Sequence, residues 1–122
     1  MEQVCVGVDI GVTSVKLGIF TLGGDLLKKW ELPTEPKNDT KALIEKIGKS
    51  IKENLKEGGL TLTDCVGVGM GVPGPVLPNG YIEVVVNIGW KEVFPARMLS
   101  DILDGMPVAL GNDANVAALG EA

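Results

Sequence analysis

The stretch "VGVDIGVTSVKLGIF", residues 6–20, carries a single acid in a largely apolar run. An acid in a buried strand is costly unless it is paired, hydrogen-bonded or bound to a metal. We therefore expect Asp9 to lie where a first strand over 4–10 ends. Gly11 then offers a turn into a second strand over 15–20, so the chain is expected to open with a β-hairpin.

Two further features extend this hairpin into a three-stranded antiparallel meander. Gly23 and Gly24 predict a tight turn, after which the run at 26–32 returns as a third strand. The unbroken, Val-rich run at 4–10 is typical of a strand covered on both faces. Together these features predict an α/β fold.

A helix is predicted after the meander. Asp39 or Thr40 is suited to cap its N-terminus, and Gly58-Gly59 is suited to end it. Its apolar positions recur at intervals of three and four residues, which places them on one face: Ile44, Ile47, Ile51 and Leu55.

The second half of the chain predicts further strands and helices. "CVGVGMGV" at 65–72 alternates glycine with larger residues, which implies that something packs close to the glycine face of this strand. The expected elements after it are a hairpin at Asn79-Gly80, a strand-like run at 81–87, a helix over 95–103, a strand over 107–110 and a helix within 112–122.

The composition restricts both the fold and the function. The 122 residues favour one domain, and with 45% hydrophobic but only 4% aromatic residues its core must be mostly aliphatic. The net charge is −5 and the lysines are scattered, so nucleic-acid binding through phosphates is not expected. The lack of His removes His-based acid–base chemistry and most zinc sites from these residues. Cys5 and Cys65 lie in apolar runs, which favours two buried free thiols in a reducing compartment over a disulfide.

The two ends of the chain also carry signals. The N-terminus has an acid where a signal peptide needs positive charge, and no apolar run approaches the roughly 18 residues of a membrane helix. A cytoplasmic protein without membrane contact is therefore expected. The last predicted helix runs to the final residue, Ala122, which predicts that residues 1–122 are one part of a larger protein.

Asp9, Gly11 and Thr13 form the motif D-x-G-x-T at the first turn. Such a turn exposes backbone N–H groups, Gly11 allows close approach of a phosphate, and Thr13 adds a hydroxyl. Asp9 is suited to hold Mg²⁺ through its water shell, because Mg²⁺ prefers carboxylates and retains several waters. The alternative is an ordinary β-turn in which Asp9 caps its own backbone.

Asn112 and Asp113 follow the predicted strand over 107–110. An open α/β sheet presents groups to a ligand at such a strand end. There Asp113 would accept a proton from a substrate hydroxyl while Asn112 hydrogen-bonds a neighbouring hydroxyl. The alternative is that the two residues only cap the next helix.

Pro73-Gly74 places bare backbone at the end of another strand, where it would hydrogen-bond the edge of a polar ligand. Asn87 and Trp90 follow in a predicted loop, the kind of segment that often carries function. The alternative is a tight turn and a Trp that only anchors the surface.

These segments, in this order, resemble the ROK family of repressors and sugar kinases. The resemblance rests on the D-x-G-x-T turn and on three segments: "GVGMGVPGPV" (67–76), "VNIGW" (86–90) and "GNDANVAALGE" (111–121). Within that family, the chain is most similar to the N-terminal half of the bacterial ATP-dependent glucokinases.

The resemblance implies a ribonuclease-H-like, actin-like ATPase fold, with a mixed sheet that opens with the meander and is flanked by helices. It also implies transfer of phosphate from ATP to a hexose, most simply glucose to glucose 6-phosphate. Asp113 matches the family's general base, and the sugar-contacting positions are matched by Asn112, Asn87, Pro73 and Gly74.

The first phosphate motif of the family is matched by Asp9, Gly11 and Thr13, so these residues are expected to serve ATP, with Asp9 holding Mg²⁺ through water. The family usually has D-x-G-G-T here, whereas this chain has Val12 in place of the second glycine.

The resemblance also implies how the protein is organised into domains. Residues 1–122 are expected to form the sugar-binding, catalytic-base domain of a two-domain kinase, with the nucleotide domain outside them. The family's Glu-x-x-His motif and zinc site have no counterpart in the chain, so zinc is expected only in the other half and the isolated chain is expected to be inactive. The whole protein is expected to be a homodimer or homotetramer in carbohydrate metabolism.

Two other functions compete with the kinase. Repressors of the same family carry an added DNA-binding element before the first strand, and Met1 leads almost directly into that strand. Non-catalytic actin-like ATPase modules share the D-x-G-x-T turn but lack the Asn-Asp pair.

Overall fold

The computed structural model describes residues 3–35, 39–72, 82–85 and 90–112. Its helices are α1 (Thr40–Glu57) and α2 (Pro95–Ile102), with a short 3-10 helix, η1 (Leu62–Asp64). Its strands are β1 (Val4–Ile10), β2 (Ser14–Thr21), β3 (Leu26–Pro33), β4 (Cys65–Val72), β5 (Ile82–Val85), β6 (Trp90–Val93) and β7 (Val108–Asn112).

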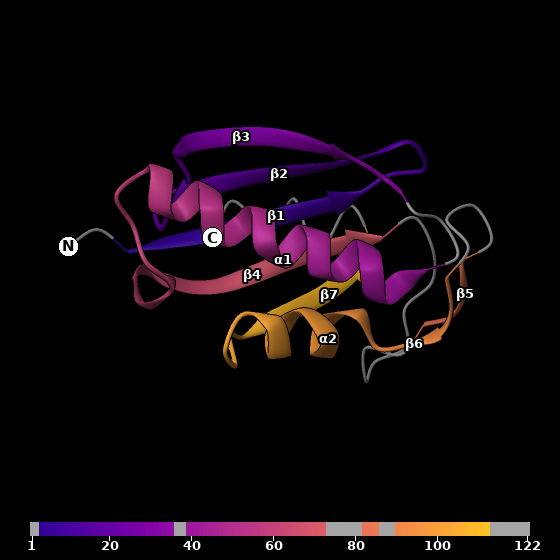
Figure 1. Ribbon diagram of the computed structural model, residues 1–122. Coiled ribbons are helices and arrows are strands. Elements are labelled where there is room, and N and C mark those ends of the chain that lie inside the picture. The colour runs from indigo at the N-terminus through magenta and orange to yellow at the C-terminus, as the bar shows by residue number, and fades with distance from the viewer. Residues whose placement is uncertain (1–2, 36–38, 73–81, 86–89, 113–122) are drawn as a thin grey trace.

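Five strands form a mixed sheet in the order β3-β2-β1-β4-β7, and β5 pairs with β6 in a separate two-stranded sheet (Figure 1). The β1–β2 and β2–β3 pairs are antiparallel, which confirms the predicted meander. The β1–β4 and β4–β7 pairs are parallel. The turn predicted at Gly23-Gly24 is also confirmed, with Gly24 at a φ of 97° that an L side chain rarely adopts.

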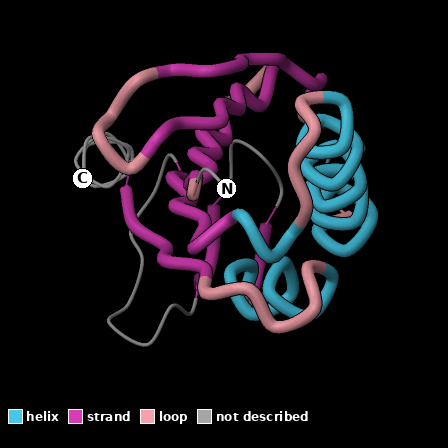
Figure 2. Tube along the Cα trace, turned by 90° about the vertical axis from the view of Figure 1, so that its left-hand side faces the viewer, coloured by secondary structure: helices cyan, strands magenta, loops and turns pink. Residues whose placement is uncertain are grey.

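The core lies between the sheet and the two helices, which cover the same face (Figure 2). Alternate residues of β1 are buried against them: Val4, Val6, Val8 and Ile10. The residues between, Cys5, Gly7 and Asp9, are only half-buried. The prediction that 4–10 is covered on both faces is therefore wrong for the part of the chain that the structure describes. The Val-rich run in fact alternates valine with small or polar residues, and only the valines belong to the core.

Helix α1 follows the predicted pattern closely. Asp39 caps it, with its Oδ1 accepting a hydrogen bond of 3.0 Å from the backbone N–H of Ala42. Gly58 ends it, and its N–H donates to carbonyls of the last turn. The four apolar positions expected at helical spacing are all buried, at 0–1% exposure.

We expect Asp39→Ala to lower the stability of the domain by about 1 kcal/mol, because N-cap substitutions leave an amide of the first turn without its partner. The measurement is thermal denaturation of the intact protein. Asp25→Ala is the matched control, since Asp25 is an exposed turn residue whose carboxylate makes no hydrogen bond within the described residues. Equal melting temperatures for the two variants would contradict the capping role.

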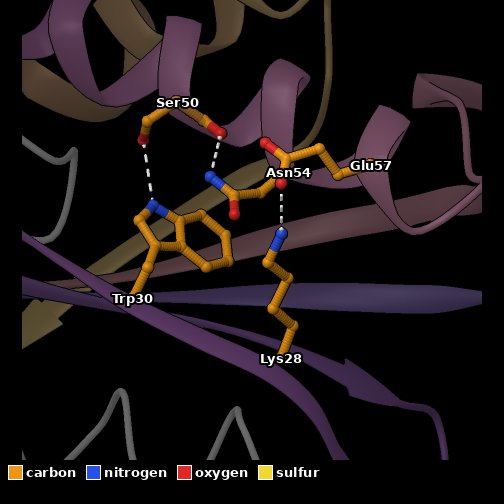
Figure 3. A network of polar contacts seen from close by, with 5 residues as sticks. All are labelled: Lys28, Trp30, Ser50, Asn54 and Glu57. Carbon is orange, nitrogen blue, oxygen red and sulfur yellow. Dashed lines mark hydrogen bonds and ion pairs between the residues drawn. The ribbon is translucent and has the colours of Figure 1, made fainter.

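A polar network ties the edge strand β3 to α1 (Figure 3). Trp30 Nε1 donates to Ser50 Oγ at 3.2 Å, and Asn54 Nδ2 donates to the Ser50 carbonyl at 2.8 Å. Lys28 Nζ lies 3.1 Å from Glu57 Oε1. These contacts hold the outermost strand of the meander against the helix that covers the sheet.

Several other predictions can be compared with the structure. Trp90 was expected in a loop, which is wrong, because it is the first residue of β6 and pairs with Val85. Cys5 and Cys65 are free, as expected, although Cys5 is half-buried rather than buried. The hairpin at 79–80 and the helix from 113 onward lie outside the described residues. Among the helices that the structure describes, none combines the length and apolar character needed to span a membrane.

Candidate functional site

The three parallel strands β1, β4 and β7 end at the same edge of the sheet (Figure 1). Their last residues are in register: Asp9 lies beside Gly71, Gly71 beside Gly111, and Val72 beside Asn112. Ligands of open α/β sheets bind outside the carboxyl ends of the strands, so this edge is the candidate site.

Asp9 is the penultimate residue of β1, so the prediction that it lies at a strand end is confirmed. It is half-buried, and within the described residues its carboxylate makes no hydrogen bond. The turn is closed by the Gly11 N–H, which donates to the Ser14 carbonyl at 2.8 Å, and not by a cap from the Asp9 side chain. An uncommitted carboxylate of this kind fits a Mg²⁺ ion held through water. The described residues contain no group of three or more His, Cys, Asp or Glu side chains that could hold a metal ion.

The turn itself leaves hydrogen-bond donors unused. Among the described residues, the backbone N–H groups of Val12 and Thr13 donate to no acceptor, and the exposed Thr13 hydroxyl has no partner. Gly11 is required for a local reason, since a Cβ there would lie 2.9 Å from the Ser14 carbonyl oxygen. Val12 is 41% exposed, so its side chain points away from the core. Unused amides in a tight turn are the groups that bind phosphate oxygens.

Charged residues lie beside Asp9 on the same face of the meander. Lys16 on β2 is directly across from Asp9, and Glu31 on β3 is directly across from Lys16. Opposite charges on directly paired residues stabilise an antiparallel pair modestly. Lys16 belongs to no motif of the sequence, although the hairpin register alone places it opposite Asp9.

Thr34 is a residue of the site that the sequence analysis missed. It follows β3, its side chain is fully buried, and its Oγ1 donates to the Gly11 carbonyl at 2.9 Å. Its backbone N–H donates to the Thr13 carbonyl at 3.1 Å. The contact spans 23 residues of sequence, and nothing in the local pattern distinguishes Thr34 from an ordinary loop hydroxyl.

Of the remaining predicted site residues, the structure describes only Asn112. Asn112 is the last residue of β7, which places it at the candidate edge. The proposed base, Asp113, lies outside the described residues, as do Pro73, Gly74 and Asn87. In the sequence, Pro73 and Asp113 directly follow β4 and β7, the strands that end at the edge where the D-x-G-x-T turn lies.

A shallow groove of about 420 Å³ crosses the sheet face that α1 and α2 leave open. Small residues of β1, β4 and β7 line it, including Cys5, Gly7, Gly69 and Ala109. Burial raises the pKa of the Cys5 and Cys65 thiols, so both are poor nucleophiles near neutral pH. The groove therefore offers packing surface and no reactive group.

Comparison with known proteins places the chain in a family. The sequence profile of the ROK family matches residues 5–122. The chain belongs to the ROK family. A glucokinase from Halalkalibacterium halodurans is 36% identical over 117 residues, covering 95% of this ROK chain and 35% of the glucokinase. A xylose repressor from Caldicellulosiruptor bescii is 26% identical over 117 residues, covering 95% of this chain and 29% of the repressor.

Solved structures agree on the fold. A ROK hexokinase from Thermus thermophilus has a TM-score of 0.79 at 34% identity, over 96% of this ROK chain and 37% of that one. A ROK family glucokinase from Streptomyces griseus, solved in complex with glucose and AMPPNP, has a TM-score of 0.79 at 28% identity. The match covers 97% of this chain and 36% of the glucokinase. The expected actin-like ATPase fold is thereby confirmed. The chain spans only 35% of the length of the glucokinase that it matches.

Proposed function

We propose that the intact protein is an ATP-dependent hexose kinase and that the hexose is glucose. The observation that carries this proposal is the convergence at one sheet edge. The D-x-G-x-T turn, with unused amides and an uncommitted Asp9 carboxylate, lies at the edge where β7 ends in Asn112, the residue before Asp113 in the sequence. A phosphate site and a sugar site at one edge are what phosphoryl transfer requires, because it depends mainly on positioning and charge neutralisation.

On the sugar side, Asp113 acts as the general base for the attacking hydroxyl. An aspartate has a reference pKa near ~3.9 and is a weak base for an alcohol, so the proton moves late, as the hydroxyl becomes acidic in the transition state. Asn112, Asn87 and the backbone of Pro73-Gly74 hydrogen-bond the other sugar hydroxyls and orient the ring.

On the phosphate side, the amides of the turn and the Thr13 hydroxyl bind phosphate oxygens of ATP. Asp9 holds the water shell of Mg²⁺, which when bound neutralises phosphate charge. The half-buried, uncommitted state of the Asp9 carboxylate supports this role. Lys16, across from Asp9, adds a positive charge on the same face.

The proposal assigns residues 1–122 to the N-terminal, sugar-binding domain, with the nucleotide domain and any zinc site in the rest of the protein. The isolated chain should therefore release little or no ADP. We place the whole protein in the cytoplasm, in glycolytic carbohydrate metabolism, as a homodimer or homotetramer.

A second candidate is a sugar-sensing repressor that does not phosphorylate its ligand. The observation that favours it is the similarity of this chain to a xylose repressor over 95% of its length. The repressor and the kinase would share the sugar site, and they differ in whether ATP is consumed.

The test is sugar-dependent ADP release by the intact protein across glucose, mannose, fructose, N-acetylglucosamine and allose. We expect turnover with at least one hexose, and none with 6-deoxyglucose, which lacks the hydroxyl that accepts the phosphate. Sugar binding without ADP release from any member of the panel would favour the repressor and overturn the kinase.

A further inference from the structure

We propose that Thr34 is a positioning residue that holds the D-x-G-x-T turn in the shape that binds phosphate; this inference rests on the proposed function of the turn. Thr34 lies 21–23 residues from the turn in sequence but contacts it twice. Its Oγ1 donates to the Gly11 carbonyl at 2.9 Å, and its N–H donates to the Thr13 carbonyl at 3.1 Å.

The hydroxyl bond constrains the backbone at Val12. The Gly11 carbonyl and the Val12 N–H belong to one peptide unit, which is planar and trans, so the two groups point in opposite directions. Because the carbonyl points at the buried Thr34 hydroxyl, the Val12 N–H points away from Thr34. That N–H has no acceptor among the described residues and is thus left for a ligand.

Because this hydrogen bond is buried, breaking it costs more free energy than breaking a hydrogen bond at the surface. The Thr34 side chain is 0% exposed, and a buried hydroxyl or carbonyl without a partner loses its hydration with no compensation. Thr34 Oγ1 donates only to the Gly11 carbonyl within the described residues. The cost of breaking the bond therefore opposes rotation of the Gly11–Val12 peptide.

Three hydrogen bonds fix the conformation and the position of the turn. The Gly11 N–H to Ser14 carbonyl bond closes the turn, and the two Thr34 bonds attach it to the end of β3. The end of β3 is in turn held to the sheet, where Pro33 pairs with Ser14. The carbonyls of Gly11, Thr13 and Ser14 are all engaged inside the fold, which leaves the N–H groups of Val12 and Thr13 as the unused donors.

The test is a set of three variants of the intact protein. Thr34→Val removes the hydroxyl at nearly constant volume, Thr34→Ser retains it, and Ser50→Ala is the control. Ser50 Oγ also bridges β3 and α1, through Trp30 (Figure 3), and its hydrogen bonds within the described residues are with Trp30 and the Ile47 carbonyl, not with the turn. We expect Thr34→Val to raise the KM for ATP about tenfold, with the KM for the sugar changed by less than about twofold. Thr34→Ser should restore the wild-type values, and Ser50→Ala should leave both constants unchanged.

A second measurement keeps this inference separate from the proposed function. Hydrogen exchange of the peptide covering residues 10–14, without nucleotide, should be faster in Thr34→Val than in wild type, Thr34→Ser or Ser50→Ala. If the wild-type protein turns over no sugar, the proposed function fails, and this exchange result alone decides whether Thr34 holds the turn. Unchanged exchange in Thr34→Val would overturn the inference. So would a KM for ATP that stays within about twofold of wild type, or one that Thr34→Ser does not restore.

Discussion

Asp113→Asn is expected to lower the kcat of the intact protein by about 10²–10⁴-fold, the range that a general base contributes. The amide has nearly the shape of the carboxylate and can still hydrogen-bond a sugar hydroxyl, but it cannot accept the proton. The Kd for the sugar should therefore change far less than kcat. The measurement combines steady-state ADP release with sugar titration monitored by calorimetry.

Asp101→Asn is the matched control for this variant, because Asp101 is an exposed residue of α2 and undergoes the same chemical change. It should keep wild-type kinetics. A kcat for Asp113→Asn within about tenfold of wild type would exclude Asp113 as the base. The candidate edge would then need another base for the sugar hydroxyl.

A large loss of stability is expected from a substitution in the core between α1 and the sheet. Ile47 on α1 is 0% exposed and belongs to the cluster that packs against the valines of β1. Ile47→Ala is expected to cost about 2–5 kcal/mol, from lost burial and from the cavity that remains. Native-state hydrogen exchange of the α1 amides measures this cost within the domain.

Because Ile47 lies on the face opposite Asp9, kcat at low temperature should change little in this variant, although stability falls. Lys49→Ala is the control on the same helix. Lys49 is highly exposed, and its one ion pair with the described residues is a 4.0 Å contact with Glu53, so its removal should cost less than about 0.5 kcal/mol. Equal exchange in the two variants would mean that the helix does not depend on this core.

The parts of the fold that were predicted correctly depend on local patterns. Asp39, the Ile residues at helical spacing and Gly58 define α1 without reference to the rest of the chain. The bounds predicted for 65–72 match β4, because the alternation of glycine with larger residues begins and ends there. The meander was predictable because each of its turns carries glycine.

The parts that were missed depend on contacts between distant segments. Trp90 was predicted in a loop because the four residues of β6 are too few to show a period, and the strand is stabilised by pairing with β5. The contact between Thr34 and Gly11 cannot be inferred from spacing alone. Gly11 was interpreted as leaving room for a phosphate, whereas the structure adds a reason inside the turn, the nearby Ser14 carbonyl.

The candidate site was also predicted only in part. Asp9, Gly11 and Thr13 lie in a turn at a strand end, as the motif indicated. The order β1-β4-β7, which brings this turn to the same edge as Asn112, follows from the sheet topology and not from any single motif. The roles of Asp113, Asn87, Pro73 and Gly74 stay predictions.

The intact protein is proposed to transfer phosphate from ATP to a hexose. Phosphorus NMR of the protein with glucose, Mg²⁺ and ATP tests this proposal most directly. We expect a new phosphomonoester resonance, from glucose 6-phosphate, that grows in step with ADP and grows about 10²–10⁴-fold more slowly with Asp113→Asn. ADP that accumulates without a phosphomonoester from any hexose tested, or ATP that stays intact while the sugar binds, would contradict the claim.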